Sequence, residues 1–333
     1  MSTLQISDTK VSVVLCGYNQ AAYVAEAVES VLSQTHSNLE LIVVDNGSTD
    51  GSQGLLMRYR GAPRIQLLLH ADNAPVTVRL NDAIARTSGE YVSMLYADDF
   101  YLPHKLERQV QEFMQLGPDY GLVYSPGYRL NVETRHRWVD RSLKRSGDIL
   151  EEMFVRHFTE GFINPIAPLI RRECFIRYPF HEDLFNEGES IFWRFALSYK
   201  FRYMEEPLVV MREHGSNMGK AIKKNAVIGL LLLDKLSQEP EFPPRLMPAL
   251  NMFRADALGV LSWLGIRMAA DPRWARATAL EAIRRRPRQL LRLRTLGALV
   301  LSVLPVSAVC LLNRLMNAMA SHNETVTFKE DYS

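Results

Sequence analysis

The chain has 333 residues, of which 47% are hydrophobic and 23% charged, with 18 Gly and 16 Pro. This composition excludes a disordered chain, a collagen and a disulfide scaffold, and the length allows one large domain with an appendage or two domains. The formal net charge of +2 gives no basis for a nucleic-acid partner. The charge is uneven, however, because residues 271–295 hold eight Arg against one Asp and one Glu.

The cysteines and the first residues indicate a reducing compartment. Cys16, Cys174 and Cys310 lie far apart and have neither CxxC nor metal-binding spacing, which predicts inert, unpaired thiols. The first ten residues lack the apolar core of a signal peptide. We therefore expect the chemistry to take place in the cytoplasm.

The first part of the chain alternates between strand and helix patterns. A short β-branched run followed by Gly17 is typical of a buried parallel strand, and a helical pattern comes next. We expect strands at 11–16, 39–44, 65–69 and 91–95, and helices at 20–34, 75–87 and from Pro103. This alternation predicts an α/β fold, Rossmann-like, with a mainly parallel sheet flanked by helices and its working loops at the carboxyl ends of the strands.

Beyond residue 120 the pattern becomes mixed and then helical. We expect short strands near 121–125, 166–170 and 202–210, helices near 148–157 and 189–199, and after residue 221 helices at 222–237, 244–268 and 272–285. The mixed part is expected to hold the second substrate. The sequence therefore predicts a catalytic domain at 1–220 and a helical C-terminal region at 221–333.

Two loops at predicted strand ends carry groups that suit a ligand. Asp98 and Asp99 follow a buried strand, and a short acidic loop there suits Mg²⁺ or Mn²⁺ bound to a diphosphate. The loop Asp45–Gly51 offers a carboxylate acceptor and glycines that allow a flat ligand to approach the backbone. Taken singly, the acidic loop is better explained as an ordinary turn with a helix cap, and the loop Asp45–Gly51 can equally be a plain turn.

A set of short segments, taken together and in their order along the chain, is highly specific for one protein family. They are Val11–Asn19, Ser30–Thr35, Leu41–Ser52, Asn73 with Arg79–Asn81, Ser88–Tyr91 with Ala97–Asp99, and Glu206–Asn217. The chain resembles the family 2 glycosyltransferases of GT-A fold over roughly residues 10–220. The resemblance implies an enzyme that moves a sugar from a nucleotide-diphospho-sugar to an acceptor hydroxyl, inverts the anomeric centre and uses a divalent cation, Mn²⁺ or Mg²⁺.

The resemblance also assigns residues to the donor. Tyr18 and Asn19 would flank the base, and Asp45 would bind uracil or its equivalent, so a UDP-sugar is the expected donor. Asn73 and Asn81 would line the nucleotide pocket, or would instead tie loops together.

The metal loop follows from the same resemblance. Ala97 and Asp98 would lie at the donor, and Asp98, Asp99 and His214 would hold the metal. Tyr96 stands where the family usually has the first Asp of Asp-x-Asp-Asp, so a ribose contact is lost or replaced. Arg212 and Lys220 would counter the diphosphate, or would belong to a solvated basic loop.

The general base is the point at which the chain departs most from the family pattern. The family usually has Glu-Asp before a helix, with Asp as the base, whereas this chain reads Asn186-Glu-Gly-Glu-Ser190. Glu189 is the first candidate and Glu187 the second. Either glutamate is equally explained as a charge that complements the dipole at the start of a helix.

The C-terminal region combines a basic cluster with an apolar run. Six arginines between 284 and 294 precede Leu296–Leu312, which Pro305 interrupts and which is shorter than the about 20 residues of a spanning helix. We expect residues 284–316 to associate with an anionic membrane surface. The alternatives are a helix that packs on protein and a membrane span. The interfacial interpretation places the protein on the inner face of the membrane, as a peripheral protein.

These observations predict an inverting glycosyltransferase of cell-surface polysaccharide or glycolipid assembly, acting on a glycan or lipid-linked acceptor. One alternative is a degenerate sugar-nucleotide-binding protein without activity, because Tyr96 and Ser190 replace expected carboxylates. Another is a sugar-phosphate nucleotidylyltransferase. That class expects a Gly-rich loop after the first strand, where residues 17–20 offer a single Gly.

Overall fold

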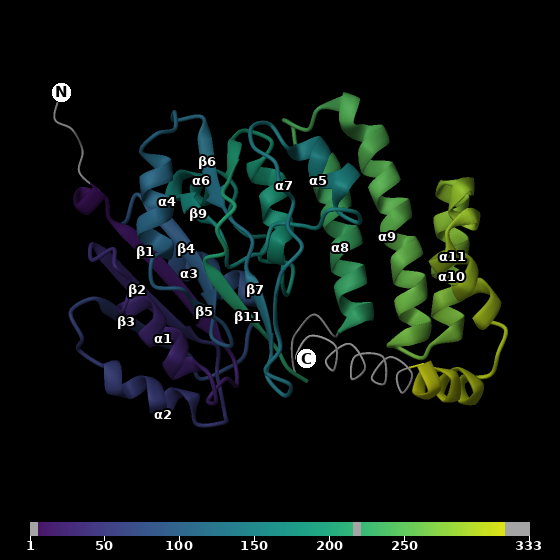
Figure 1. Ribbon diagram of the computed structural model, residues 1–333, viewed down its shortest axis with the longest axis horizontal. Coiled ribbons are helices and arrows are strands. Elements are labelled where there is room, and N and C mark those ends of the chain that lie inside the picture. Colours follow the sequence, from purple (N-terminus) through teal and green to yellow (C-terminus); the bar gives the residue numbers. More distant parts are fainter. Residues whose placement is uncertain (1–5, 216–220, 317–333) are drawn as a thin grey trace, which may run out of the picture. The chain divides into compact units, whose positions relative to one another are not determined.

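The computed structural model describes residues 6–215 and 221–316 (Figure 1). The chain divides into two compact units. The first comprises Met1–Asn217 with Lys235–Phe242, and the second comprises Met218–Asp234 with Pro243–Ser333.

A seven-stranded sheet forms the centre of the first unit, in the order β10-β6-β9-β4-β1-β2-β3. Its strands are β1 (Val11–Gly17), β2 (Leu39–Asp45), β3 (Ile65–Leu69), β4 (Tyr91–Tyr96), β6 (Tyr120–Tyr124), β9 (Leu169–Arg171) and β10 (Lys200–Tyr203). β1 pairs in parallel with β2 and with β4, and β2 pairs in parallel with β3. Only β9 runs antiparallel to its neighbours β4 and β6. The predicted mainly parallel sheet is confirmed.

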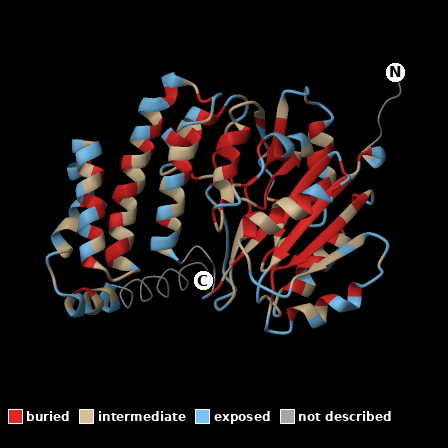
Figure 2. Ribbon diagram, turned by 180° about the vertical axis from the view of Figure 1, so that it is seen from behind, coloured by how far each residue is buried: buried red, intermediate tan, exposed pale blue. Residues whose placement is uncertain are grey.

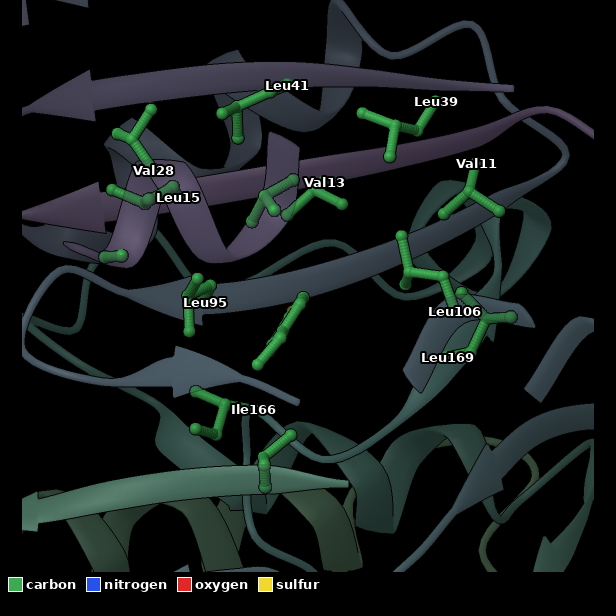
Figure 3. Close-up of a cluster of buried hydrophobic side chains, with 14 of the residues drawn as sticks. Val11, Val13, Leu15, Val28, Leu39, Leu41, Leu95, Leu106, Ile166 and Leu169 are labelled. Atoms are coloured by element: carbon green, nitrogen blue, oxygen red, sulfur yellow. The ribbon is translucent and has the colours of Figure 1, made fainter. Parts of the chain in front are cut away.

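The central strands are apolar on both faces because both faces are covered. Val11, Val13 and Leu15 of β1 point to one face, where they pack with Val28 and Leu41, as Figure 3 shows. The alternate residue Val14 is equally buried on the other face. Figure 2 shows buried residues along the whole length of these strands.

The helices of the first unit cover the sheet. α1 (Val24–Leu32), α2 (Ser52–Leu56) and α4 (Lys105–Phe113) contribute buried residues to the cluster on the face of Val13. After β3 the chain crosses back to β4 on the far side of β1, and α3 (Val76–Ala85) makes this crossing and contacts β1 and β2. Because such crossovers are right-handed, the reversal places α3 on the opposite face. The shorter α5 (Leu150–Arg156), α6 (Arg172–Arg177) and α7 (Ile191–Phe195) follow.

A smaller four-stranded sheet, in the order β5-β11-β7-β8, completes the first unit. Its strands are β5 (Phe100–Tyr101), β7 (Tyr128–Asn131), β8 (Arg137–Val139) and β11 (Val209–Glu213). The single strand predicted at 202–210 is wrong, because the segment forms β10 of the large sheet and β11 of the small one. Pro207, which has no N–H for a ladder, lies between the two strands. The helix predicted at 189–199 is shorter and consists of a 3-10 turn, Gly188–Ser190, followed by α7.

The second unit is helical. It contains the main part of α8 (Ile222–Ser237), then α9 (Met247–Arg267), α10 (Pro272–Arg285) and α11 (Leu293–Leu301), with residues 306–316 helical again. Glycines allow close packing: a Cβ at Gly265 of α9 would lie 2.7 Å from the ring of Trp274 of α10. The apolar run expected at 296–312 is two helical segments that break around Pro305. None of the helices in the described ranges has the length and hydropathy that a membrane crossing requires.

Candidate active site

The carboxyl ends of β1 and β4 lie at the place where the strand order of the sheet reverses. Loops leaving two adjacent parallel strands in opposite directions open a crevice there, which is where α/β sheets bind ligands. The two strand ends approach closely, since a Cβ at Gly17 would lie 2.4 Å from the Cβ of Ala97. Gly17 is therefore required for this geometry, and Ala97 lies at the crevice.

The loops after β1 and β2 are held together by reciprocal hydrogen bonds. The Asn19 N–H donates to Ser48 Oγ over 2.8 Å, and the Thr49 N–H donates to Asn19 Oδ1 over 2.8 Å. Asn19 has a φ of 55°, in the left-handed region that Asn adopts more readily than most residues. Tyr18 beside it is 42% exposed, so its ring is accessible to a flat ligand.

Asp45 ends β2 and is buried. Its Oδ1 accepts hydrogen bonds of 2.8 Å from the Ser48 N–H and from Gln53 Nε2. These bonds close the turn after β2 and fix the carboxylate at the strand end. Recognition of the nucleobase by Asp45 remains a prediction. In it, the second carboxylate oxygen of Asp45 would accept a hydrogen bond from the nucleobase.

Asn46, which the sequence argument did not single out, links three segments. Its Nδ2 donates to Asn73 Oδ1 at 2.9 Å and to Ala74 O at 2.8 Å, and its Oδ1 accepts from Arg79 Nε at 3.0 Å. The amide thus holds the loop that contains Asn73 against the end of β2. Its position directly after Asp45 in a turn-rich loop was the signal that could have revealed it.

Asn81 ties loops together, which was the alternative to its place in the nucleotide pocket. Its Nδ2 donates to Phe180 O at 2.9 Å and to Glu182 Oε1 at 3.0 Å, and its Oδ1 accepts from the Phe180 N–H at 3.0 Å. Both ends of the amide are used, so it anchors the 180–182 segment on α3.

Asp98 and His214 come together although 116 residues separate them. His214 Nε2 lies 3.1 Å from Asp98 Oδ2, and the Tyr23 ring stacks on the imidazole with a centroid distance of 5.3 Å. The small sheet makes this contact possible, because β11 ends at Glu213 beside the acidic loop.

Asp99 turns away from this pair. Its Oδ1 accepts a hydrogen bond of 2.8 Å from the Arg212 N–H, and the side chain is buried. Burial and the neighbouring charge of Asp98 raise the pKa of Asp99 well above its usual value. In this geometry Asp99 joins the acidic loop to β11, which differs from the predicted role of metal ligand.

Arg212 holds the acidic loop in place through its guanidinium group. Its NH1 donates to Asp98 O over 2.8 Å, its NH2 pairs with Glu26 at 2.5 Å, and its guanidinium lies over the rings of Phe100 and Tyr23. The side chain is only 6% exposed. Arg212 therefore positions Asp98 and is not the accessible cation that was predicted to counter the diphosphate. Lys220, the other predicted cation, lies outside the described residues.

The residues present suit a divalent cation bound jointly with a diphosphate. No cluster of three or more His, Cys, Asp or Glu within ranges 6–215 and 221–316 could hold a metal alone. Asp98 and His214 supply one carboxylate and one imidazole, while Mg²⁺ and Mn²⁺ commonly complete their coordination with phosphate oxygens and water. Asp98 and His214 are thus the pair that would hold the ion against the donor.

The two candidate bases have different surroundings. Glu187 is fully buried and pairs with Arg194 at 2.7 Å, while its Oε2 accepts the His181 N–H at 2.9 Å. Burial raises the pKa of Glu187 even though the charge of Arg194 opposes the shift. This carboxylate is engaged in a structural ion pair.

Glu189 lies instead in a small pocket, whose wall includes His157, Phe162 and Trp193. Burial raises the pKa of Glu189, and the charge of Arg129 opposes the shift. Burial raises the pKa of Tyr96, next to the acidic loop, and smaller contributions in the same direction come from Cys16 and then from Glu189. A carboxylate of raised pKa near the acidic loop has the properties of a general base.

Residues 12–178 match the model of the family described as "Glycosyl transferase family 2". The chain belongs to glycosyl transferase family 2. A curated relative, the uncharacterized glycosyltransferase alr2836 of Nostoc sp., is 39% identical over 218 residues, covering 62% of this chain and 66% of the relative. The putative teichuronic acid biosynthesis glycosyltransferase TuaG of Bacillus subtilis is 38% identical over 106 residues, covering 32% and 42%. The chain spans between 25% and 66% of the length of the first curated relatives that it matches.

Solved structures of low sequence identity share the fold. S. aureus TarS, solved with UDP-GlcNAc, is 15% identical, with a TM-score of 0.58 over 85% of this chain and 91% of that one. The mannosyltransferase PcManGT from Pyrobaculum calidifontis, solved with GDP-Man and Mn²⁺, is 18% identical, with a TM-score of 0.57 over 92% and 87%. The predicted GT-A type of fold is confirmed.

Proposed function

We propose that this protein transfers a sugar from a nucleotide-diphospho-sugar to an acceptor hydroxyl with inversion, using a divalent cation held by Asp98 and His214. The observation that carries the proposal is their 3.1 Å contact at the crevice of a family 2 fold. A departing nucleoside diphosphate gains negative charge, and a bound Mn²⁺ or Mg²⁺ would neutralise it. PcManGT, whose fold is similar, was solved with Mn²⁺ and GDP-Man.

Glu189 is proposed as the general base. A single displacement requires a group that accepts the proton of the acceptor hydroxyl, and it requires no protein nucleophile. The pocket beside Glu189 and its raised pKa support this role, whereas Glu187 is engaged with Arg194.

The donor is proposed to be a UDP-sugar, with the base between Tyr18 and the loop of Asp45. The accessible ring of Tyr18 and the fixed carboxylate of Asp45 support this placement. TarS was solved with UDP-GlcNAc and PcManGT with GDP-Man, so a donor panel must include both nucleotides.

The acceptor is proposed to be a glycan or a lipid-linked intermediate of cell-surface polysaccharide assembly at the inner face of the membrane. The name of the relative TuaG, a putative teichuronic acid biosynthesis glycosyltransferase, agrees with this class of product. The basic and apolar segment 284–316 supports a membrane location.

The test is a screen of UDP- and GDP-sugars with Mn²⁺, in which nucleoside diphosphate release is measured with and without membrane lipid extract. We expect release from one class of donor, an increase with the extract, and loss with a chelator or in Asp98→Asn. Nucleotide binding without release from any donor would contradict the proposal. It would favour the non-catalytic binding protein, for which Tyr96 at the place of an expected Asp is the specific observation.

A further inference from the structure

The turn between α10 and α11 presents leucines and arginines outward from a firmly anchored backbone. Here residues 288–294 are named the Leu–Arg rim. Gln289 within it is buried, bonds to Asp256 of α9 and accepts from Thr295 Oγ1 at 3.3 Å. A Cβ at Gly259 of α9 would lie 2.8 Å from Gln289 Oε1, so the rim packs closely on that helix. The exposure of its other side chains is therefore imposed by packing.

Large apolar side chains are exposed on the rim and along α11. Leu291 and Leu293 are 82% and 87% exposed, among the most exposed large hydrophobic side chains of the described residues. Leu293, Leu296 and Val300 follow at i, i+3 and i+7 and form one exposed stripe along α11, whereas the face packed inward carries Thr295 and Ala298. In an ordinary surface helix the large apolar side chains face inward and the polar side chains face the solvent. Large apolar side chains gathered on one exposed face of a helix indicate a partner.

The arginines of the rim indicate which partner. Arg288, Arg292 and Arg294 are exposed, and their guanidinium groups have no ion-pair partner within the residues that the structure describes. The nearby carboxylates are used by other arginines: Glu281 pairs with Arg284 and Arg285. The rim thus alternates leucines with uncompensated positive charges over seven residues. This combination matches an anionic lipid surface, in which guanidinium groups meet phosphates and leucines enter the acyl region.

We propose that the Leu–Arg rim and the exposed stripe of α11 are the membrane-binding surface of this protein, specific for anionic lipid. The inference deepens the proposed membrane location, on which it rests, and narrows the predicted membrane-associating segment 284–316 to one exposed surface. Ala298 and Val309 of that segment are buried with Ile266 and Ala275 in the helical core, so these two side chains do not take part in the surface.

The experiment is sedimentation of the full chain with vesicles of phosphatidylglycerol and phosphatidylcholine, compared with vesicles of phosphatidylcholine alone. We expect binding to the anionic vesicles that weakens as salt increases. Arg288→Gln/Arg292→Gln/Arg294→Gln should lower partitioning about fivefold per arginine, or about a hundredfold in all. Leu291→Ala/Leu293→Ala should lower it by at least about tenfold, because each inserted methylene is worth about fourfold.

Matched controls are Ile176→Ala, a 67% exposed residue of α6, and Arg108→Gln in α4, which should bind as the wild type does. Circular dichroism and nucleotide binding in solution check that each variant is folded. Absence of binding to anionic vesicles, or equal binding by the rim variants, overturns the proposal. Self-association that the leucine variants abolish, without vesicle binding, also overturns it and assigns the rim to a protein interface. None of these results depends on turnover, so they are independent of the proposed transferase activity.

Discussion

Replacing Glu187 by Gln separates a structural carboxylate from a catalytic one. The side chains of Glu187 and Arg194 are 0% and 6% exposed, so water screens the pair very little. Glu187→Gln keeps the shape and an acceptor oxygen but leaves the buried Arg194 without a counter-charge, which typically costs about 3–5 kcal/mol. For a domain of about 150–250 residues, each kcal/mol shifts Tm by roughly 2–4 °C, so we expect a fall of roughly 10 °C.

The assay pairs thermal unfolding, followed by circular dichroism, with donor turnover measured below the transition. Glu187→Gln should unfold early yet retain turnover where it is folded. The matched variant Glu189→Gln should keep the wild-type Tm within a few degrees and lose turnover by about 10²-fold or more, as the loss of a general base does. A Glu187→Gln protein that is as stable as the wild type and inactive would show that the ion pair with Arg194 is not needed for stability and would make Glu187 the base.

Three further predictions follow from the site and its loops. Burial raises the pKa of Glu189, and a general base must be ionised to act. As the pH is lowered, kcat/KM should therefore fall with an apparent pKa above the usual 4.5 of a glutamate. An apparent pKa at or below 4.5 would argue against Glu189 as the base. Arg212→Lys removes the hydrogen bond from the guanidinium to Asp98 O and should lower the apparent affinity for Mn²⁺ about 10–100-fold while the fold is retained. An unchanged Mn²⁺ titration would count against a positioning role for Arg212. Gly47 and Gly51 have positive φ values of 79° and 96°, but a Cβ at Gly47 would lie 2.3 Å from the backbone of the loop after β3, whereas a Cβ at Gly51 would meet open space. Gly47→Ala should therefore lower Tm more than Gly51→Ala does. Equal Tm values for the two variants would disprove the close approach at Gly47.

The parallel part of the fold was predictable because its local patterns are strong. The β-branched run that predicts a strand at 11–16 corresponds to Val11–Gly17, and α10 begins and ends where the sequence indicates. The small sheet was not predictable, since it pairs β5, β7 and β11 from distant parts of the chain. Splitting 202–210 between two sheets is a tertiary event, for which Pro207 was the only local signal.

Site residues could be predicted where the order of the motifs identifies them. Their roles could not be predicted where the partners of the side chain decide the role. The contact between Asp98 and His214 follows from the family resemblance. Arg212 lies two residues before His214 and also contacts the acidic loop, but its guanidinium lies over the Tyr23 ring and pairs with Glu26, and motif order alone does not reveal these partners. Glu187 likewise looks equivalent to Glu189 until its ion pair with Arg194 is seen.

The proposed activity depends on a divalent cation that Asp98 and His214 hold against the diphosphate of the donor. Calorimetric titration of the donor nucleotide, with and without Mn²⁺, into the wild type, Asp98→Asn and His214→Ala measures this role of the two residues. We expect Mn²⁺ to tighten nucleotide binding to the wild type, and we expect either substitution to remove this effect while metal-free binding persists. Equal tightening by Mn²⁺ in all three proteins, or none in the wild type, would contradict this role.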